Sequence, residues 1–367
     1  MYILKKIGKL SKMSFYCWRT ILKGYARFGF RLYYLKSLLE CTEIVYNPNH
    51  LFHMSFGSLN KGKTIAIIRL DRKWVPTAGF FALLLKTLCG LYYASNNGFE
   101  PVIFAWEGST YQEKEMINGT QNVFEYYFKP VSEIKIEDAL NSYSVIDISE
   151  YNENIAFLEN ESQWFDMKDE FIELMGRIYR KYILLNDYIS NGMNEQIRDL
   201  LSGKKSLGIH FRGSDYKLNT NGHPVSLEVE DYYEYIDEAI DKYQFSQIFI
   251  ATDDRRALNK FAERYKNVVF YSDVERTDGD VSVAFLENKR EKHHFLLGYE
   301  VLRDAYTLAS CSGFIGGQSQ VSVNVRIHKA SKEEKFDYCK ILKKGINRNS
   351  LDWMKYYYTN LSKCDES

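Results

Sequence analysis

Residues 206–254 of the chain read SLGIHFRGSDYKLNTNGHPVSLEVEDYYEYIDEAIDKYQFSQIFIATDD. The apolar runs at 206–211 and 247–252 have the length of buried strands, and tyrosine and isoleucine recur on one helical face across 231–243. Strand, helix and strand at this spacing predict a parallel βαβ unit. The pattern continues with expected helices at 256–265, 295–310 and 319–328 and expected strands at 267–272 and 313–317. Four strands, each followed by helical sequence, predict a parallel doubly wound sheet that binds ligands at the carboxyl ends of its strands.

The first half of the chain carries a second, less complete pattern of this kind. TIAIIRL at 64–70 predicts a strand, the apolar stretch that ends near residue 94 predicts a helix, and PVIFAW at 101–106 predicts another strand. Further along, 167–189 predicts one amphipathic helix and 194–201 a short second one. At about 100–200 residues per domain, 367 residues suggest two domains. We therefore expect an α/β fold of two open, Rossmann-like doubly wound domains that face a cleft.

The charge distribution excludes one class of function and singles out one segment. The chain holds 48 basic and 48 acidic residues, and this balance argues against a dedicated nucleic-acid-binding protein. Residues 1–40, however, carry nine basic side chains against one acid, together with nine aromatics. Two interpretations remain open: a segment that rests on an anionic membrane surface, or a basic helix that packs on the acidic remainder of the chain. No stretch of this segment is long and apolar enough for a span of about 20 residues.

The sequence offers no evident metal site. Its six cysteines are far apart with no C-x-x-C pair, which predicts neither a zinc site nor a disulfide framework and favours a reducing, cytoplasmic compartment. TDGD at 277–280 resembles a D-x-D metal motif. Aspartate and glycine in this order are also turn formers, so we interpret the motif as a solvated turn.

Polar side chains follow the predicted strands in the second half. His210, Arg212 and Asp215 stand at the end of the first strand, where an arginine can present a planar fork to a phosphate and Asp215 can orient it or act as a base. The alternative is a plain salt bridge between Arg212 and Asp215. After the next strand come Asp253 and Asp254, and Asp254 can equally cap the helix that begins near residue 255.

The last of these strand ends is GFIGGQSQVS at 313–322. Its glycines and serines open a helix whose first backbone N–H groups can cradle an anion. A simple strand–turn–helix connection has the same sequence features, so both interpretations stay open for this segment.

Taken in this order, the motifs resemble the GDP-fucosyltransferase superfamily, in particular the α1,6-type enzymes that include nodulation fucosyltransferases and N-glycan core fucosyltransferases. The family motif H-x-R-R-x-D is matched by residues 210–215, A-T-D-D by 251–254 and F-x-S-D by 270–273, followed by an Asp-bearing helix and a serine-rich loop. The resemblance implies a GT-B fold and transfer of fucose from GDP-fucose with inversion, with no metal and no cofactor. It implies Arg212 and Asp215 as catalytic residues. It implies as donor-binding residues His210, Arg212, Asp253, Asp254, Asp304, Gly316, Gly317, Ser319, Gln320 and Ser322.

Two departures from the family pattern leave alternatives open. Gly213 replaces the second arginine of the first motif, and the acidic residue expected further on has no counterpart, so Asp215, Glu228 and Glu230 remain candidates for the base. A different nucleotide sugar, or an inactive binding protein, is the alternative to a fucosyltransferase. The expected organisation is a basic segment (1–40), an acceptor-side domain (41–203), a donor domain (204–345) and a C-terminal helix (346–367). We expect the acceptor to be a surface polysaccharide or lipid-linked glycan, reached from the cytoplasmic side of the membrane.

Overall fold

The computed structural model describes residues 43–47, 51–70, 75–104, 106–148, 164–213, 215–278, 282–283 and 290–352. The basic segment 1–40 and most of the expected C-terminal helix lie outside these ranges. Residues 346–352, which are described, contain no helix. No helix of the described part of the chain is both long and apolar enough to cross a membrane.

The second half of the chain forms the parallel sheet that its sequence pattern predicts. The strands are β6 (Ser206–Phe211), β7 (Gln247–Thr252), β8 (Val268–Val269), β9 (Gly313–Gly317) and β10 (Tyr338–Leu342). They pair in parallel in the order β10-β9-β6-β7-β8. β6 and β7 are buried along their whole length because helices cover both faces of the sheet. β8 is much shorter than the strand expected at 267–272, and β10 was not expected.

Four helices connect these strands: α8 (Glu230–Tyr243), α9 (Arg255–Arg264), α10 (His293–Ser310) and α11 (Gln320–Ser331). From β6 the chain moves outward to β7 and β8, and then returns to the other side of β6 to form β9. The direction of winding therefore reverses between β6 and β9. This reversal is the topological switch point of a doubly wound sheet, where ligands bind.

The first half forms a second α/β sheet, which confirms the two-sheet architecture. Its strands are β1 (Glu43–Asn47), β2 (Leu51–Ser55), β3 (Ile65–Ile68), β4 (Glu100–Ile103) and β5 (Val145–Asp147), in the order β1-β2-β5-β3-β4. Helix α3 (Phe80–Asn96) joins β3 to the parallel strand β4, as the sequence predicts. The sheet is mixed, because β2 runs antiparallel to both β1 and β5.

The single helix expected at 167–189 is wrong. The chain forms α6 (Asp169–Tyr182) and α7 (Asp187–Leu201), with a break at residues 183–186. Asn186 starts the second helix, since its side chain accepts a hydrogen bond from the backbone N–H of Ile189 at 3.1 Å. Its amide also donates to the carbonyl of Tyr126 at 2.9 Å, so a contact distant in sequence determines the break.

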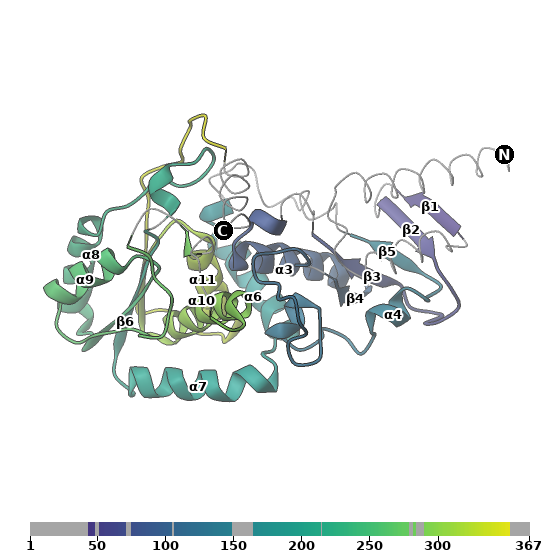
Figure 1. Cartoon of the computed structure of the whole chain (residues 1–367), viewed down its shortest axis with the longest axis horizontal. Coiled ribbons are helices and arrows are strands. Elements are labelled where there is room, and N and C mark those ends of the chain that lie inside the picture. The colour runs from purple at the N-terminus through teal and green to yellow at the C-terminus, as the bar shows by residue number, and fades with distance from the viewer. Residues whose placement is uncertain are drawn as a thin grey trace.

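The two halves share one hydrophobic core. Helices α3 and α6 from the first half pack against α10 and α11 from the second, between the two sheets (Figure 1). Polar contacts inside this layer join the Tyr127 hydroxyl to the Phe295 carbonyl at 3.0 Å and the hydroxyls of Tyr179 and Tyr306 at 2.8 Å. A large apolar interface of this kind restrains relative motion of the halves, so their facing loops form a site of stable geometry.

Candidate nucleotide-sugar site

The candidate site lies at the switch point between β6 and β9. His210 and Arg212 leave the carboxyl end of β6, and Gln318 and Ser319 lead from β9 into the N-terminus of α11. One cavity on this side is lined by α10 residues and, from the first half of the chain, by Thr110 and Tyr111. A smaller, neighbouring cavity shares His210 and Arg212 with the first. The two predicted residues therefore stand where the cavities meet.

His210 is a buried, neutral residue of the site. Its Nδ1 lies 3.5 Å from the Ser319 hydroxyl, and its backbone carbonyl accepts a hydrogen bond from Tyr232 at 3.1 Å. Burial lowers the pKa of the imidazole to about 4, and the nearby Arg212 guanidinium acts in the same direction. The ring is therefore uncharged at neutral pH, so it is able both to donate and to accept a hydrogen bond from a ligand.

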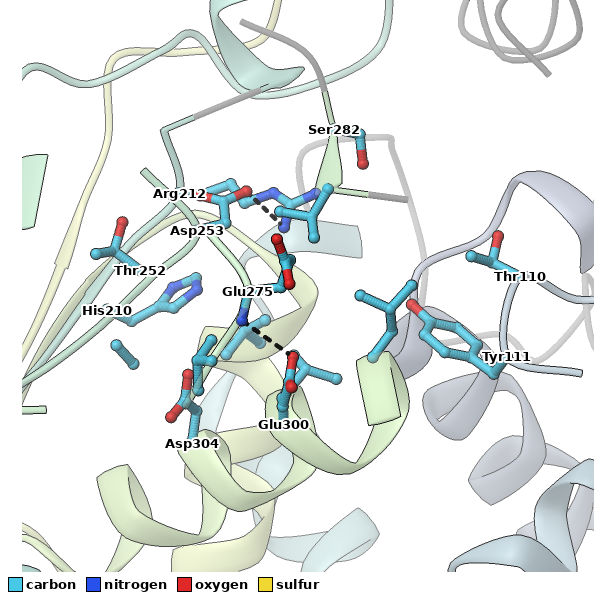
Figure 2. A pocket seen from close by; sticks show the side chains of 16 residues that line it. Thr110, Tyr111, His210, Arg212, Thr252, Asp253, Glu275, Ser282, Glu300 and Asp304 are labelled. Carbon is cyan, nitrogen blue, oxygen red and sulfur yellow. Dashed lines mark hydrogen bonds and ion pairs between the residues drawn. The ribbon is translucent and has the colours of Figure 1, made fainter. Parts of the chain in front are cut away.

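Arg212 is held by Asp253. The guanidinium Nη1 lies 3.0 Å from one oxygen of the Asp253 carboxylate (Figure 2). The other oxygen accepts the backbone N–H of Gly213 at 3.1 Å, so one carboxylate orients both the side chain and the following peptide. Arg212 still exposes 33% of its side chain to the cavities. A fixed, accessible guanidinium of this kind suits an anionic ligand. The alternative partner, Asp215, begins a short 3-10 helix, η4 (Asp215–Leu218), and its side chain lies outside the described part.

Gly213 has no room for the second arginine of the motif. A Cβ atom at this position would lie 2.5 Å from the Cβ of Asp254 and 2.8 Å from the Phe211 ring. Both neighbours are buried, so neither can move away cheaply. The departure from the family pattern is thus built into the packing of the β6 end against the start of α9.

Asp254 caps a helix and does not line either cavity. Its carboxylate accepts the backbone N–H groups of Arg256 at 2.9 Å and Ala257 at 3.3 Å, as expected for the residue before a helix. The Lys217 ammonium lies 3.0 Å from its other oxygen. Burial alone would raise the pKa of this carboxyl, but the bonds from Lys217 and Arg256 outweigh it and lower the pKa. Asp254 supports the site through α9, whereas Asp253 faces the cavity.

The 316–322 segment presents a helix N-terminus. Ser319 caps α11 by accepting the backbone N–H of Ser322 at 3.1 Å, and the Ser322 hydroxyl donates to the Gly317 carbonyl at 2.7 Å. Gln320 donates to the Trp164 carbonyl at 2.5 Å. Gly317 and Ser319 line the smaller cavity, whereas the Ser322 hydroxyl serves the helix start and the Gln320 side chain contacts the first half of the chain. Gly316 lines neither cavity. The first-turn amide groups and the helix dipole supply positive potential beside His210.

Asp304 is the exceptional carboxylate of the site. It projects from α10 into the first cavity (Figure 2), and no hydrogen bond or ion pair engages it within the described residues. Burial raises its pKa from 3.8 to about 7, although Arg303 and Arg276 partly offset this. Arg303 itself is committed elsewhere, because it pairs with Asp273 of the F-x-S-D motif at 2.6 Å. A partly buried acid with no partner among the described residues is suited to accept hydrogen bonds from a ligand.

Several lining residues were not predicted from the sequence. Glu300 lies one turn before Asp304 on the same face of α10, so helical periodicity alone was a sufficient signal for it. It is buried and paired with Arg290. Glu275 lines the same cavity, and its backbone N–H donates to Glu300 (Figure 2). Thr110 and Tyr111 come from a region with no readable pattern, so only the fold brings them here.

The remaining candidates are placed away from the cavities. Glu228 is exposed, and Glu230 pairs with Lys260 at 2.8 Å on the outer surface. In the TDGD turn, Asp278 is exposed and pairs with Arg255 at 3.2 Å. Among the described residues no group of histidine, cysteine or acidic side chains is arranged to hold a metal ion.

Comparison with solved structures finds fucosyltransferases. The chain is similar to NodZ alpha-1,6-fucosyltransferase soaked with GDP-fucose, with 19% identity and a TM-score of 0.44 over 73% of this chain and 92% of that one. It is similar to fucosyltransferase NodZ from Bradyrhizobium (17% identity, TM-score 0.41, 74% and 92% covered). It is also similar to POFUT1 in complex with GDP-fucose (11% identity, TM-score 0.39, 79% and 100% covered). No protein-family model and no curated protein matches the chain. At such low identities the chemistry of the site rests on its own residues.

Proposed function

We propose that the protein is a glycosyltransferase that uses a guanine nucleotide sugar, with GDP-fucose as the donor and inversion at the transferred carbon. The observation that carries this proposal is that one site holds two groups of opposite charge. Arg212 and the α11 N-terminus supply positive charge at the switch point, and the Asp304 carboxylate, which has no partner in the described part of the chain, lies in the adjoining cavity. A nucleotide sugar needs both: a cation for its diphosphate and an acceptor for its base.

The proposed reaction is a single displacement. A hydroxyl of the acceptor forms a bond to the anomeric carbon while the bond from that carbon to the β-phosphate oxygen breaks, and its electron pair leaves with GDP. Negative charge develops on the departing diphosphate, where Arg212 and the helix amides stabilise it. This positive charge replaces that of a divalent ion, so the proposal is for a metal-independent enzyme. The acceptor proton passes to a base, for which Asp215 is the candidate nearest to Arg212 in sequence.

Recognition of guanine is assigned to Asp304. Guanine presents N1–H and a 2-amino group side by side, and a carboxylate accepts both. Adenine and uracil do not offer this pair of donors on one edge. The neutral imidazole of His210 lines the same cavity and offers a further hydrogen bond.

One observation favours a second candidate, a transferase for a different nucleotide sugar. The packed position of Gly213 removes one arginine that the family uses in this motif. Thermal-shift titration with GDP, GDP-fucose and UDP-sugars separates the two candidates, and hydrolysis of the donor in the same samples separates both from an inactive binding protein. Stabilisation by UDP-sugars without any effect of GDP would contradict the guanine assignment.

For the acceptor we propose a surface polysaccharide or lipid-linked glycan at the cytoplasmic face of the membrane. The support is the basic, aromatic composition of residues 1–40, which suits an anionic lipid surface. Cosedimentation of the full-length and truncated proteins with anionic vesicles tests this part of the proposal separately.

A further inference from the structure

A second large cavity lies in the first half of the chain, outside the site described above. It is bounded by the edge strand β4, the loop over residues 107–121 and the segment over 130–137, which includes helix α4 (Ile136–Ala139). Its volume is about 910 Å³. Ligand cavities typically measure about 300–1,000 Å³, so the space is large enough for several sugar rings.

The lining of this cavity combines apolar surface with carboxylates. Val102, Phe104, Val131 and Ile134 are among its apolar residues. Four glutamates (Glu107, Glu125, Glu133 and Glu137) outnumber two lysines (Lys114 and Lys135). This excess of negative charge disfavours nucleotides and other anions. Apolar faces that alternate with hydrogen-bond acceptors instead match a neutral saccharide, whose rings carry C–H faces and hydroxyl donors.

Glu125 is the acceptor that is built into the wall, whereas Glu133 and Glu137 are exposed at the rim. Its carboxylate accepts hydrogen bonds from the Thr120 hydroxyl at 3.2 Å and the Asn122 amide at 3.0 Å. Burial raises its pKa, and these two bonds only partly offset the effect. The same Asn122 amide donates to the Ile103 carbonyl at 3.0 Å, on the outer edge of β4. That contact occupies the edge and disfavours addition of a peptide strand.

One loop contributes to the walls of both this cavity and the candidate nucleotide-sugar site. Thr110 and Tyr111 line the nucleotide-sugar cavity, whereas Gln112 lines the second cavity. The two cavities therefore lie on either side of this loop, which an extended ligand has to cross to reach from one to the other.

The dividing loop is held rigidly on both sides. The Tyr111 hydroxyl accepts the backbone N–H of Phe80 at 2.8 Å, and the Glu113 carboxylate accepts that of Phe295 at 2.9 Å. At the start of the loop, Trp106 adopts a φ of 75°, which is unusual for a bulky residue. Its full burial and the hydrogen bond from its indole to Thr87 at 3.0 Å hold this turn in place. The wall is thus a fixed feature of the fold.

We infer that the second cavity binds the acceptor, as a neutral oligosaccharide whose reacting end crosses the 107–113 loop toward Arg212. The inference rests on the proposed transferase function, because only a transferase requires a second substrate beside the donor. It predicts that acceptor binding and donor binding are separable by mutation.

The test measures saccharide binding and donor binding in the same full-length variants. Val131→Trp fills the cavity, Glu133→Lys changes its charge at an exposed rim position, and Glu195→Lys on the exposed face of α7 is the matched charge-reversal control. Saturation-transfer NMR is run with neutral tetrasaccharides of glucose, galactose and N-acetylglucosamine, with tetragalacturonate and with decanoate. Calorimetry with GDP and hydrolysis of GDP-fucose report on the donor site.

We expect a neutral tetrasaccharide to bind, and both cavity variants to weaken it by about tenfold or more while GDP affinity stays unchanged. The Glu195→Lys control should bind saccharide normally. Saccharide binding that both cavity variants leave intact, binding of decanoate or tetragalacturonate alone, or no binding of any probe overturns the inference. Failure of the proposed function looks different: GDP and GDP-fucose are then neither bound nor hydrolysed, whatever the saccharides do.

Discussion

Replacing Asp304 with asparagine should stabilise the ligand-free protein while it weakens the guanine site. Burial raises the pKa of this carboxyl from 3.8 to about 7. Between these values the folded state keeps a proton that the unfolded state has released, so the free energy of unfolding falls as the pH rises. Above about pH 7 the buried carboxylate is ionised, and the folded state carries the full destabilisation. A rise of roughly three in the pKa corresponds to a loss of about 4 kcal/mol in the free energy of unfolding. This value is an upper limit, because the side chain still contacts the cavity.

Asparagine has nearly the same shape and cannot ionise. Near pH 8 the variant should therefore unfold at a higher denaturant concentration, by up to about 4 kcal/mol, and near pH 4 it should match the wild type. Asp199→Asn, an exposed change on α7, is the control and should have little effect at either pH. Guanidinium denaturation of the three proteins across this pH range provides the measurement.

The affinity for GDP should fall in the Asp304→Asn variant, whereas its stability should rise. A hydrogen bond to a charged group contributes about 1.5–3 kcal/mol, so loss of the carboxylate should weaken GDP by at least about tenfold. Inosine diphosphate lacks the 2-amino group, so the wild type should prefer GDP and the variant should lose most of that preference. Because the carboxylate must be ionised, wild-type affinity should rise about tenfold per pH unit up to pH 7 and then level off. Equal stability changes at all pH values, or an unchanged preference for GDP over inosine diphosphate, would refute the reasoning.

The remaining predictions concern the diphosphate site, the metal, the glycine and the N-terminal segment. Arg212→Ala should lower donor turnover by about 10²–10³ with the fold intact, and Arg212→Lys should restore only part of it, because an ammonium lacks the planar fork; near-normal steady-state rates in a folded alanine variant would exclude this role. Activity should persist in excess EDTA, and Asp278→Asn with Asp280→Asn should be nearly silent; loss with EDTA and recovery with Mn²⁺ or Mg²⁺ would contradict metal independence. Gly213→Ala should lower the free energy of unfolding by about 1–3 kcal/mol in chemical denaturation, because the added Cβ meets buried atoms at 2.5 Å. An unchanged free energy of unfolding would show that the packing there is loose. Full-length protein should cosediment with anionic vesicles at low salt and be released near 1 M salt, where the Debye length is about 3 Å, and deletion of residues 1–40 should abolish this; if the deletion instead lowers the melting temperature and vesicle binding never occurs, the segment packs on the protein body.

Local patterns in the sequence were sufficient for the second sheet and for the positions of its polar strand ends. Apolar runs of strand length that alternate with helical sequence predicted β6, β7, β9 and their helices, because burial of strands and amphipathic helices leaves a periodic signal in consecutive residues. The winding rule then places His210 and Arg212 at the ligand-binding edge of the sheet. β1, β2 and β5 were missed because each is short. β1 and β2 form a local hairpin, but β2 joins the sheet only through β5, and β5 pairs with strands about 80 or more residues away in the chain.

Only the tertiary structure decided how each polar residue is used. The tetrapeptide A-T-D-D is compatible with two pocket carboxylates, but packing directs Asp253 to Arg212 and Asp254 to the start of α9. Likewise the sequence shows Gly213 as a departure from a motif, whereas the 2.5 Å approach of Asp254 shows why a side chain is excluded there. Thr110 and Tyr111 face Asp304 across one cavity because α3 and α6 dock on α10 and α11, and these contacts join residues more than a hundred positions apart. Side-chain periodicity reports which face of an element is buried, and it carries no information about which distant element covers that face.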